Sequence, residues 1–72
     1  MNVTKEDFEY MKNCLTRDIL DILVEERGLD LSQAFDLLYN SALFQKLETP
    51  KSGLYFQSPR YVLSYLDSET RP

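Results

Sequence analysis

Residues 5–27 of this 72-residue chain carry one continuous amphipathic pattern, and a helix of that length dominates any fold the chain can adopt. Thr4 is a good N-cap, and Glu6 and Asp7 lie in the first turn, where the helix dipole favours negative charge. Gly28 can take the left-handed conformation that closes a helix. Apolar residues recur at steps of three and four, the spacing of one helix face. They are Phe8, Met11, Leu15, Ile19, Ile22 and Leu23.

The next stretch predicts a second helix and a short third one. Asp30 or Ser32 can cap the second helix, and its apolar residues follow helical spacing. Asn40 and Ser41 are weak helix formers and good caps, so a break is expected between the two helices. Pro50 ends the third helix, because the residue before a proline avoids helical geometry. The apolar residues are Leu31, Ala34, Phe35, Leu38 and Ala42, and then Leu43, Phe44 and Leu47.

Turn chemistry separates these helices from a fourth. Gly53 is free to take a positive φ, and Ser58 followed by Pro59 is a strong signal for the start of a helix. Tyr61, Val62, Tyr65 and Leu66 give that helix an apolar face, and residues 68–72 should fray. The sequence therefore predicts one all-α domain over residues 1–72, a small bundle of three to four helices with a long N-terminal helix.

The residues between Gly53 and Ser58 are predicted to be a structural segment that places the fourth helix against the first two. In an extended segment, consecutive side chains point to opposite sides. Leu54 and Phe56 should then share a buried side. Tyr55 should lie at the rim, where its hydroxyl is wet and the ring is open to a partner.

Charge and cysteine content narrow the function classes. The net charge is −4, and residues 1–40 hold four Lys/Arg against nine Asp/Glu, a poor match for nucleic acid. The single cysteine, Cys14, cannot form an intramolecular disulfide, which suits a reducing cytosol. No secretory signal pattern opens the chain, and the longest apolar runs are far short of a membrane span.

Catalytic and metal chemistries find little support. The chain has no histidine, the commonest general base and metal ligand. Cys14 lies mid-helix, away from the positive end of the dipole. Asp18, Asp21 and Glu25 fall on one helix face, but a hard-cation site would need more oxygen ligands and a loop to hold them. The sequence thus predicts no enzyme, no cofactor and no metal.

The break at residues 40–41 also allows a helix-turn-helix interpretation. In that alternative the chain is a small DNA-binding regulator, and Lys46, Lys51 and Arg60 contact phosphates. The third helix is a poor recognition helix, because it is short and apolar and carries Lys46 as its one basic residue.

The second half of the chain resembles a small bacterial family of unknown function. The matching pattern is Gly-Leu-Tyr-x-x-Ser-Pro-x-Tyr, preceded by a Ser-x-x-Phe-x-Lys-Leu segment. The resemblance implies a small helical domain of the bacterial cytosol, with a toxin-like or mobile-element protein as its partner. It assigns no catalytic or binding residue. The residues that carry it are Ser41, Phe44, Lys46, Leu47, Gly53, Leu54, Tyr55, Ser58, Pro59 and Tyr61.

Helix 5–27 offers one positive reason to expect a protein partner or self-association. Opposite its main apolar face lie Tyr10, Leu20 and Val24, within roughly 80° of each other on a helical wheel. A helix that is apolar on two sides is either wrapped by its own domain or part of an interface. The sequence therefore predicts a non-enzymatic protein-interaction module, with Tyr10, Leu20, Val24 and Tyr55 as its contact residues.

Overall fold

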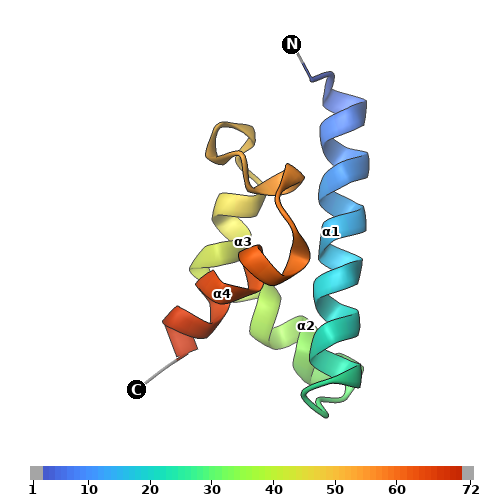
Figure 1. The fold of residues 1–72 in the computed structure, drawn as a ribbon, viewed down its shortest axis with the longest axis vertical. Helices are drawn as coiled ribbons and strands as arrows, with labels where there is room; N and C mark the ends of the chain where they lie inside the picture. The colour runs from blue at the N-terminus through green and yellow to red at the C-terminus, as the bar shows by residue number, and fades with distance from the viewer. Residues whose placement is uncertain (1–2, 71–72) are drawn as a thin grey trace.

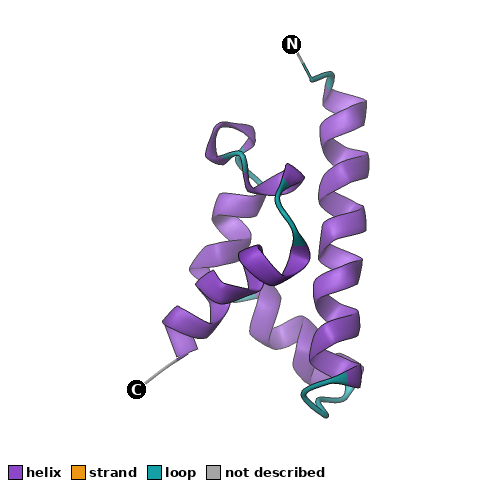
Figure 2. Cartoon of the chain, in the orientation of Figure 1, coloured by secondary structure: helices purple, strands orange, loops and turns teal. Residues whose placement is uncertain are grey.

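The computed structural model describes residues 3–70, and every regular element in that range is helical (Figures 1 and 2). These residues form four α-helices, and the link between the third and the fourth contains two single 3₁₀ turns. This confirms the predicted small all-α fold with a long first helix. The elements are α1 (Lys5–Glu25), α2 (Leu31–Tyr39), α3 (Ala42–Leu47), η1 (Pro50–Ser52), η2 (Leu54–Phe56) and α4 (Pro59–Thr70).

Helix α1 begins and ends close to the predicted residues. The Thr4 hydroxyl accepts a hydrogen bond from the backbone N–H of Asp7 at 3.1 Å, as expected of an N-cap. The helix ends at Glu25, two residues before the predicted end, and Glu26 is its C-cap, whose N–H still donates to the Ile22 carbonyl. Gly28 follows with a φ of +74°, and this left-handed residue reverses the chain toward α2.

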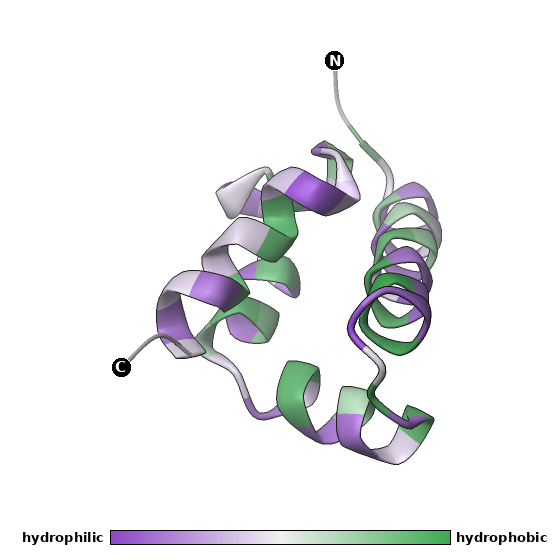
Figure 3. Ribbon diagram, turned by 60° about the horizontal axis from the view of Figure 1, so that its bottom comes forward, coloured by the Kyte–Doolittle hydropathy of each residue, from purple (hydrophilic) through white to green (hydrophobic). Residues whose placement is uncertain are grey.

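The other helices pack along one side of α1. Figure 1 shows α1 running the length of the molecule, whose longest extent is 38 Å, and α2, α3 and α4 beside it. Helix α1 contacts α2, α4 and η2. Figure 3 views α1 nearly end-on and shows the same one-sided arrangement. The core lies between α1 and the remaining helices, and its largest fully buried side chains are Ile19, Leu23, Leu38, Leu43, Leu47, Val62 and Leu66.

The break between α2 and α3 is local in origin. Ser41 leaves the helical conformation, and its hydroxyl accepts the Phe44 N–H at 3.1 Å while donating to the Leu38 carbonyl at 2.5 Å. Helix α2 itself starts with a capping box between Asp30 and Gln33. Both the break and the Asp30 cap agree with the sequence.

Helix α4 is longer than predicted at its C-terminal end. It starts at Pro59, and the Ser58 hydroxyl accepts the Tyr61 N–H at 3.2 Å. It continues through Thr70, so the fraying predicted for residues 68–72 is wrong for residues 68–70, while 71–72 lie outside the described residues. The physical reason is a contact between helices: the Glu69 carboxylate accepts the backbone N–H groups of Ala42 and Leu43 at 2.8 and 2.7 Å.

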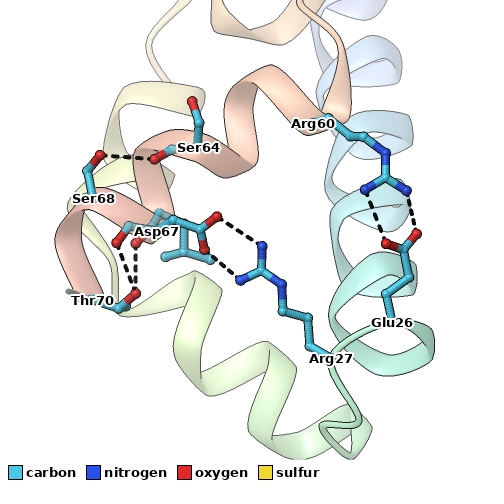
Figure 4. Close-up of polar contacts among 8 residues, drawn as sticks. Glu26, Arg27, Arg60, Ser64, Asp67, Ser68 and Thr70 are labelled. Atoms are coloured by element: carbon cyan, nitrogen blue, oxygen red, sulfur yellow. Dashed lines mark hydrogen bonds and ion pairs between the residues drawn. The ribbon is translucent and has the colours of Figure 1, made fainter.

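Two bidentate ion pairs hold α4 to the end of α1, as Figure 4 shows. Arg27 donates to both carboxylate oxygens of Asp67, at 2.6 and 2.9 Å. Arg60 forms the same forked contact with Glu26. The hydrogen bonds from Arg60 lower the pKa of Glu26, and those to Asp67 raise the pKa of Arg27. Both pairs are exposed, so they position the two helices more than they stabilise the fold.

Acid should weaken the contribution of the Arg60–Glu26 pair. The folded-state pKa of Glu26 lies below its ordinary value of 4.5, so the pair contributes fully above that pH and is lost as pH falls through the lowered pKa. We expect the melting-temperature difference between wild type and Glu26→Gln to shrink between about pH 6 and pH 3. Glu25→Gln is the matched control and should show a small, nearly constant difference. A Glu26→Gln difference that grows toward acid pH would contradict this assignment.

Candidate partner-binding groove

The predicted contact residues of α1 do not form one exposed surface. Tyr10 is 71% exposed, whereas Leu20 is only 7% exposed and belongs to the core. Val24 is half-buried and packs against the same core. The reason lies in the packing of α2 against the C-terminal half of α1, which Figure 1 shows. The prediction of Leu20 as a contact residue is therefore wrong, and Tyr10 alone of the three presents most of its side chain to solvent.

The predicted orientation of the Leu54–Phe56 segment is also wrong. Tyr55 is buried at 8% exposure, and Phe56 is 59% exposed, the reverse of the prediction. The segment is not extended: it forms the 3₁₀ turn η2, closed by a hydrogen bond from the Gln57 N–H to the Leu54 carbonyl at 3.1 Å. With three residues per turn, successive side chains point about 120° apart. Leu54 and Tyr55 therefore both reach the core, and Phe56 points outward.

A chain of aromatic rings joins η2 to α1. The Tyr55 ring meets the Phe8 ring edge-on, with centroids 5.0 Å apart and planes at 78°. The Phe56 ring meets the Tyr55 ring in the same way, at 5.0 Å and 85°. Such edge-to-face pairs add about 0.5–1.5 kcal/mol beyond the area they bury. The exposed Phe56 ring is therefore supported from beneath by a buried one.

A shallow apolar groove of about 260 Å³ runs between α1 and this turn. One wall comes from α1, and the other comes from η2 and the start of α4. The two exposed rings, Tyr10 and Phe56, both line it, and we call it the Tyr10–Phe56 groove. Its main lining residues are Tyr10, Met11, Cys14 and Leu15 from α1, with Tyr55 and Phe56 opposite them.

Along α1, carboxylate side chains lie at both ends of this groove. Asp7, Asp18 and Glu25 fall within about 20° of one another on the helical wheel, and Asp21 lies about 60° from Asp18. Asp18 itself lines the groove, and the other three are exposed. Within residues 3–70, none of the four forms an ion pair. We call these four residues the acidic strip.

The carboxylates of the acidic strip do not cluster. Among the described residues, no group of three or more Cys, Asp or Glu side chains comes together in a way that could hold a metal ion. The strip is spread along α1 instead, so its carboxylates act as separate surface charges.

Of the basic residues named for the DNA-binding alternative, Lys46 and Lys51 line one hollow and Arg60 lies elsewhere. Lys46 and Lys51 line a second shallow hollow beside α3 and η1, and the Lys46 ammonium sits 5.6 Å from the centre of the Tyr65 ring. Arg60 does not line that hollow, because it binds Glu26. Helix α3 has six residues and buries Leu43 and Leu47. That the chain does not bind nucleic acid stays a prediction.

A second apolar surface, the α2–α3 patch, was not predicted as a surface. Leu31, Phe35 and Phe44 were counted in the apolar pattern of these helices, and Tyr39 was not named, but Leu31 and Tyr39 are exposed, and Phe35 and Phe44 are half-buried. The Tyr39 ring contacts both phenylalanine rings, at 5.0 and 4.6 Å between centroids.

Comparison with known proteins adds no relative: no family model, no curated protein and no solved structure matches the chain. Within residues 3–70, no helix is long and apolar enough to span a membrane.

Proposed function

We propose that the chain is a non-enzymatic protein-interaction module of a bacterial cytosolic protein, and that the Tyr10–Phe56 groove is its partner-binding surface. One observation carries the proposal: two of the most exposed aromatic rings of the molecule line the same apolar hollow. Single exposed apolar residues are ordinary on protein surfaces. Aromatic side chains grouped around an apolar concavity are instead typical of interface hot spots.

The construction of the groove favours binding. The Phe56 ring rests on Tyr55, and it also lies beside Gly53, where the chain turns with a φ of +72° and an added β-carbon would be in ordinary van der Waals contact with the ring at 3.6 Å. The turn is anchored on its other side by Pro59 at the start of α4. A side chain that is already ordered loses less conformational entropy when a partner binds. The resemblance of the second half of the chain to a bacterial family supports a toxin-like or mobile-element protein as that partner.

Site-specific photo-crosslinking in cells that make the protein tests the proposal. With benzoylphenylalanine in place of Tyr10, we expect a covalent adduct with one protein, because the probe lies in the contact surface. The same probe in place of Tyr39, on the α2–α3 patch, is the matched control and should give little of that adduct. Adding Phe56→Ala to the Tyr10 probe should reduce the yield. Equal adduct yields at both positions, or none at position 10, would refute the proposal.

A further inference from the structure

We infer that the Tyr10–Phe56 groove binds a basic amphipathic helix of a different protein, with an apolar centre and cationic residues on both sides. The inference rests on the proposed function and names the chemistry of its partner. Three observations carry it: the apolar groove, the acidic strip that continues it in both directions along α1, and the spacing of those residues on the helix.

The spacing indicates that the partner segment is a helix aligned with α1. Residues at alternating steps of four and three form a continuous seam on a helix surface, which is the pattern along which two helices pack lengthwise. On α1 this seam includes residues 7, 11, 14, 18, 21 and 25. Met11 and Cys14, in the middle of its N-terminal part, line the groove. The remaining seam positions are the four carboxylates of the acidic strip.

The charges on α1 indicate that the partner residues on either side of the apolar centre are cationic. No carboxylate of the acidic strip forms an ion pair within the described residues. Asp7 lies about 6 Å along the helix axis from Met11, and Asp18 lies about 6 Å beyond Cys14, at 1.5 Å per residue. An apolar side chain of the partner in the groove would therefore have a carboxylate about one turn away on each side. Lysine or arginine at those positions fits, and acidic residues there would be repelled.

The same charges disfavour a symmetric pair of identical chains on this face. A two-fold interface places the same patch on both sides. Two acidic strips would then face each other, and within residues 7–25 of α1 the basic side chains are Arg17 and Lys12, the latter already paired with Glu9. Nucleic acid is disfavoured for the same reason. Of the three occupants considered, a second copy of the chain, nucleic acid and a cationic helix from another protein, the cationic helix fits the charges of this face.

Three designed peptides test the inference on the purified 72-residue chain. Each has the same leucines at its centre, and the flanking positions are Lys in the first, Gln in the second and Glu in the third. Binding is measured by fluorescence anisotropy of a dye on the peptide. We expect the Lys peptide to bind at least about tenfold more tightly than the Gln peptide and the Glu peptide to bind most weakly, with a loss of affinity as salt is added. Equal binding of the Lys and Glu peptides would overturn the inference.

Two matched pairs of variants locate the contact. Asp18→Asn with Asp21→Asn should weaken the Lys peptide about three- to tenfold, whereas Asp36→Asn with Glu48→Gln changes the net charge equally and should leave binding unchanged. Phe56→Ala should weaken it about tenfold, and Leu31→Ala should not. Equal losses within either pair would show non-specific attraction and overturn the inference.

Cys14 provides an independent readout, because it is the one cysteine of the chain and lines the groove. The Lys peptide should slow modification of Cys14 by a thiol reagent. Saturating peptide that leaves the modification rate unchanged would place the binding elsewhere and overturn the inference.

Sedimentation of the free chain tests the alternative occupant: a dimer that Phe56→Ala dissociates would show a second copy in the groove and would also overturn the inference. A Tyr10 crosslink in cells together with equal peptide binding would refute the cationic helix and leave the proposed function standing.

Discussion

Tyr55→Ala should leave the chain unfolded or nearly so, whereas Phe56→Ala should fold and melt close to wild type. Tyr55 is buried and its ring packs edge-on against Phe8. Removing a large buried aromatic side chain costs about 3–5 kcal/mol. A single core in a chain of this size supplies roughly 3–5 kcal/mol of net stability, so the loss is comparable to the whole. Phe56 is more than half exposed, and its removal should cost less than about 1 kcal/mol.

Circular dichroism during thermal or urea unfolding separates these outcomes. Tyr55→Phe is the control for ring loss, because the Tyr55 hydroxyl makes no hydrogen bond within residues 3–70, so this variant should melt near wild type. If Phe56→Ala destabilises the chain as much as Tyr55→Ala, then η2 does not present Phe56 to solvent, and the groove loses its wall. The experiment thus tests the geometry of the candidate site as well as the stability of the fold.

The sequence predicted those parts of the fold whose causes are local. The Thr4 and Asp30 caps, the break at Ser41 and the start of α4 at Pro59 each depend on residues within one turn of the feature. Such signals can be recognised without knowing what lies across the domain. The all-α class and the long first helix follow from them together with the helical spacing of the apolar residues.

The candidate site was predicted poorly because it depends on how elements meet. Tyr10 was identified as exposed from the helical wheel of α1. The wheel predicted the same exposure for Leu20, which is buried, because a helical wheel does not show that α2 packs against this part of α1. The exposures of Tyr55 and Phe56 were predicted the wrong way round, because apolar residues between a glycine and a Ser-Pro pair are compatible with both an extended segment and a 3₁₀ turn. The shortness of that link, from Gly53 to Ser58, was the one available signal that the chain turns there. Met11 and Cys14 became groove residues only when η2 was placed beside them.

Glu69 shows the same limit at the end of the chain. Its position in a polar C-terminal stretch predicted a frayed residue. In the structure its carboxylate satisfies two backbone N–H groups at the start of α3, more than twenty residues earlier in the sequence. Those groups have no partner within their own helix, because the first turn of a helix lacks acceptors for its N–H groups. The order of residues 68–70 is therefore set by a contact that local signals do not contain.

Glu69→Ala should consequently destabilise the chain by about 1–2 kcal/mol, within the range for loss of a helix cap. For a domain of this size that corresponds to a fall in melting temperature of roughly 5–15 °C. The effect should be local as well as global: the amide protons of Ala42 and Leu43 should exchange with solvent faster than in wild type, because they lose their acceptors. Thermal melting and amide hydrogen exchange measure the two effects separately.

Two further variants, one at Glu69 and one at the preceding residue, make the Glu69 prediction specific. Glu69→Gln keeps the shape of the side chain but leaves one oxygen acceptor and no charge, so it should lose part of the stability that Glu69→Ala loses. Ser68→Ala removes only a hydrogen bond within α4, from the Ser68 hydroxyl to the Ser64 carbonyl, and should melt near wild type. If Glu69→Ala also melts like wild type and the exchange of Ala42 and Leu43 is unchanged, then Glu69 does not cap α3. The last turn of α4 is then held by its other contacts, which include the Arg27–Asp67 pair and the hydrogen bond from the Thr70 hydroxyl to the Leu66 carbonyl.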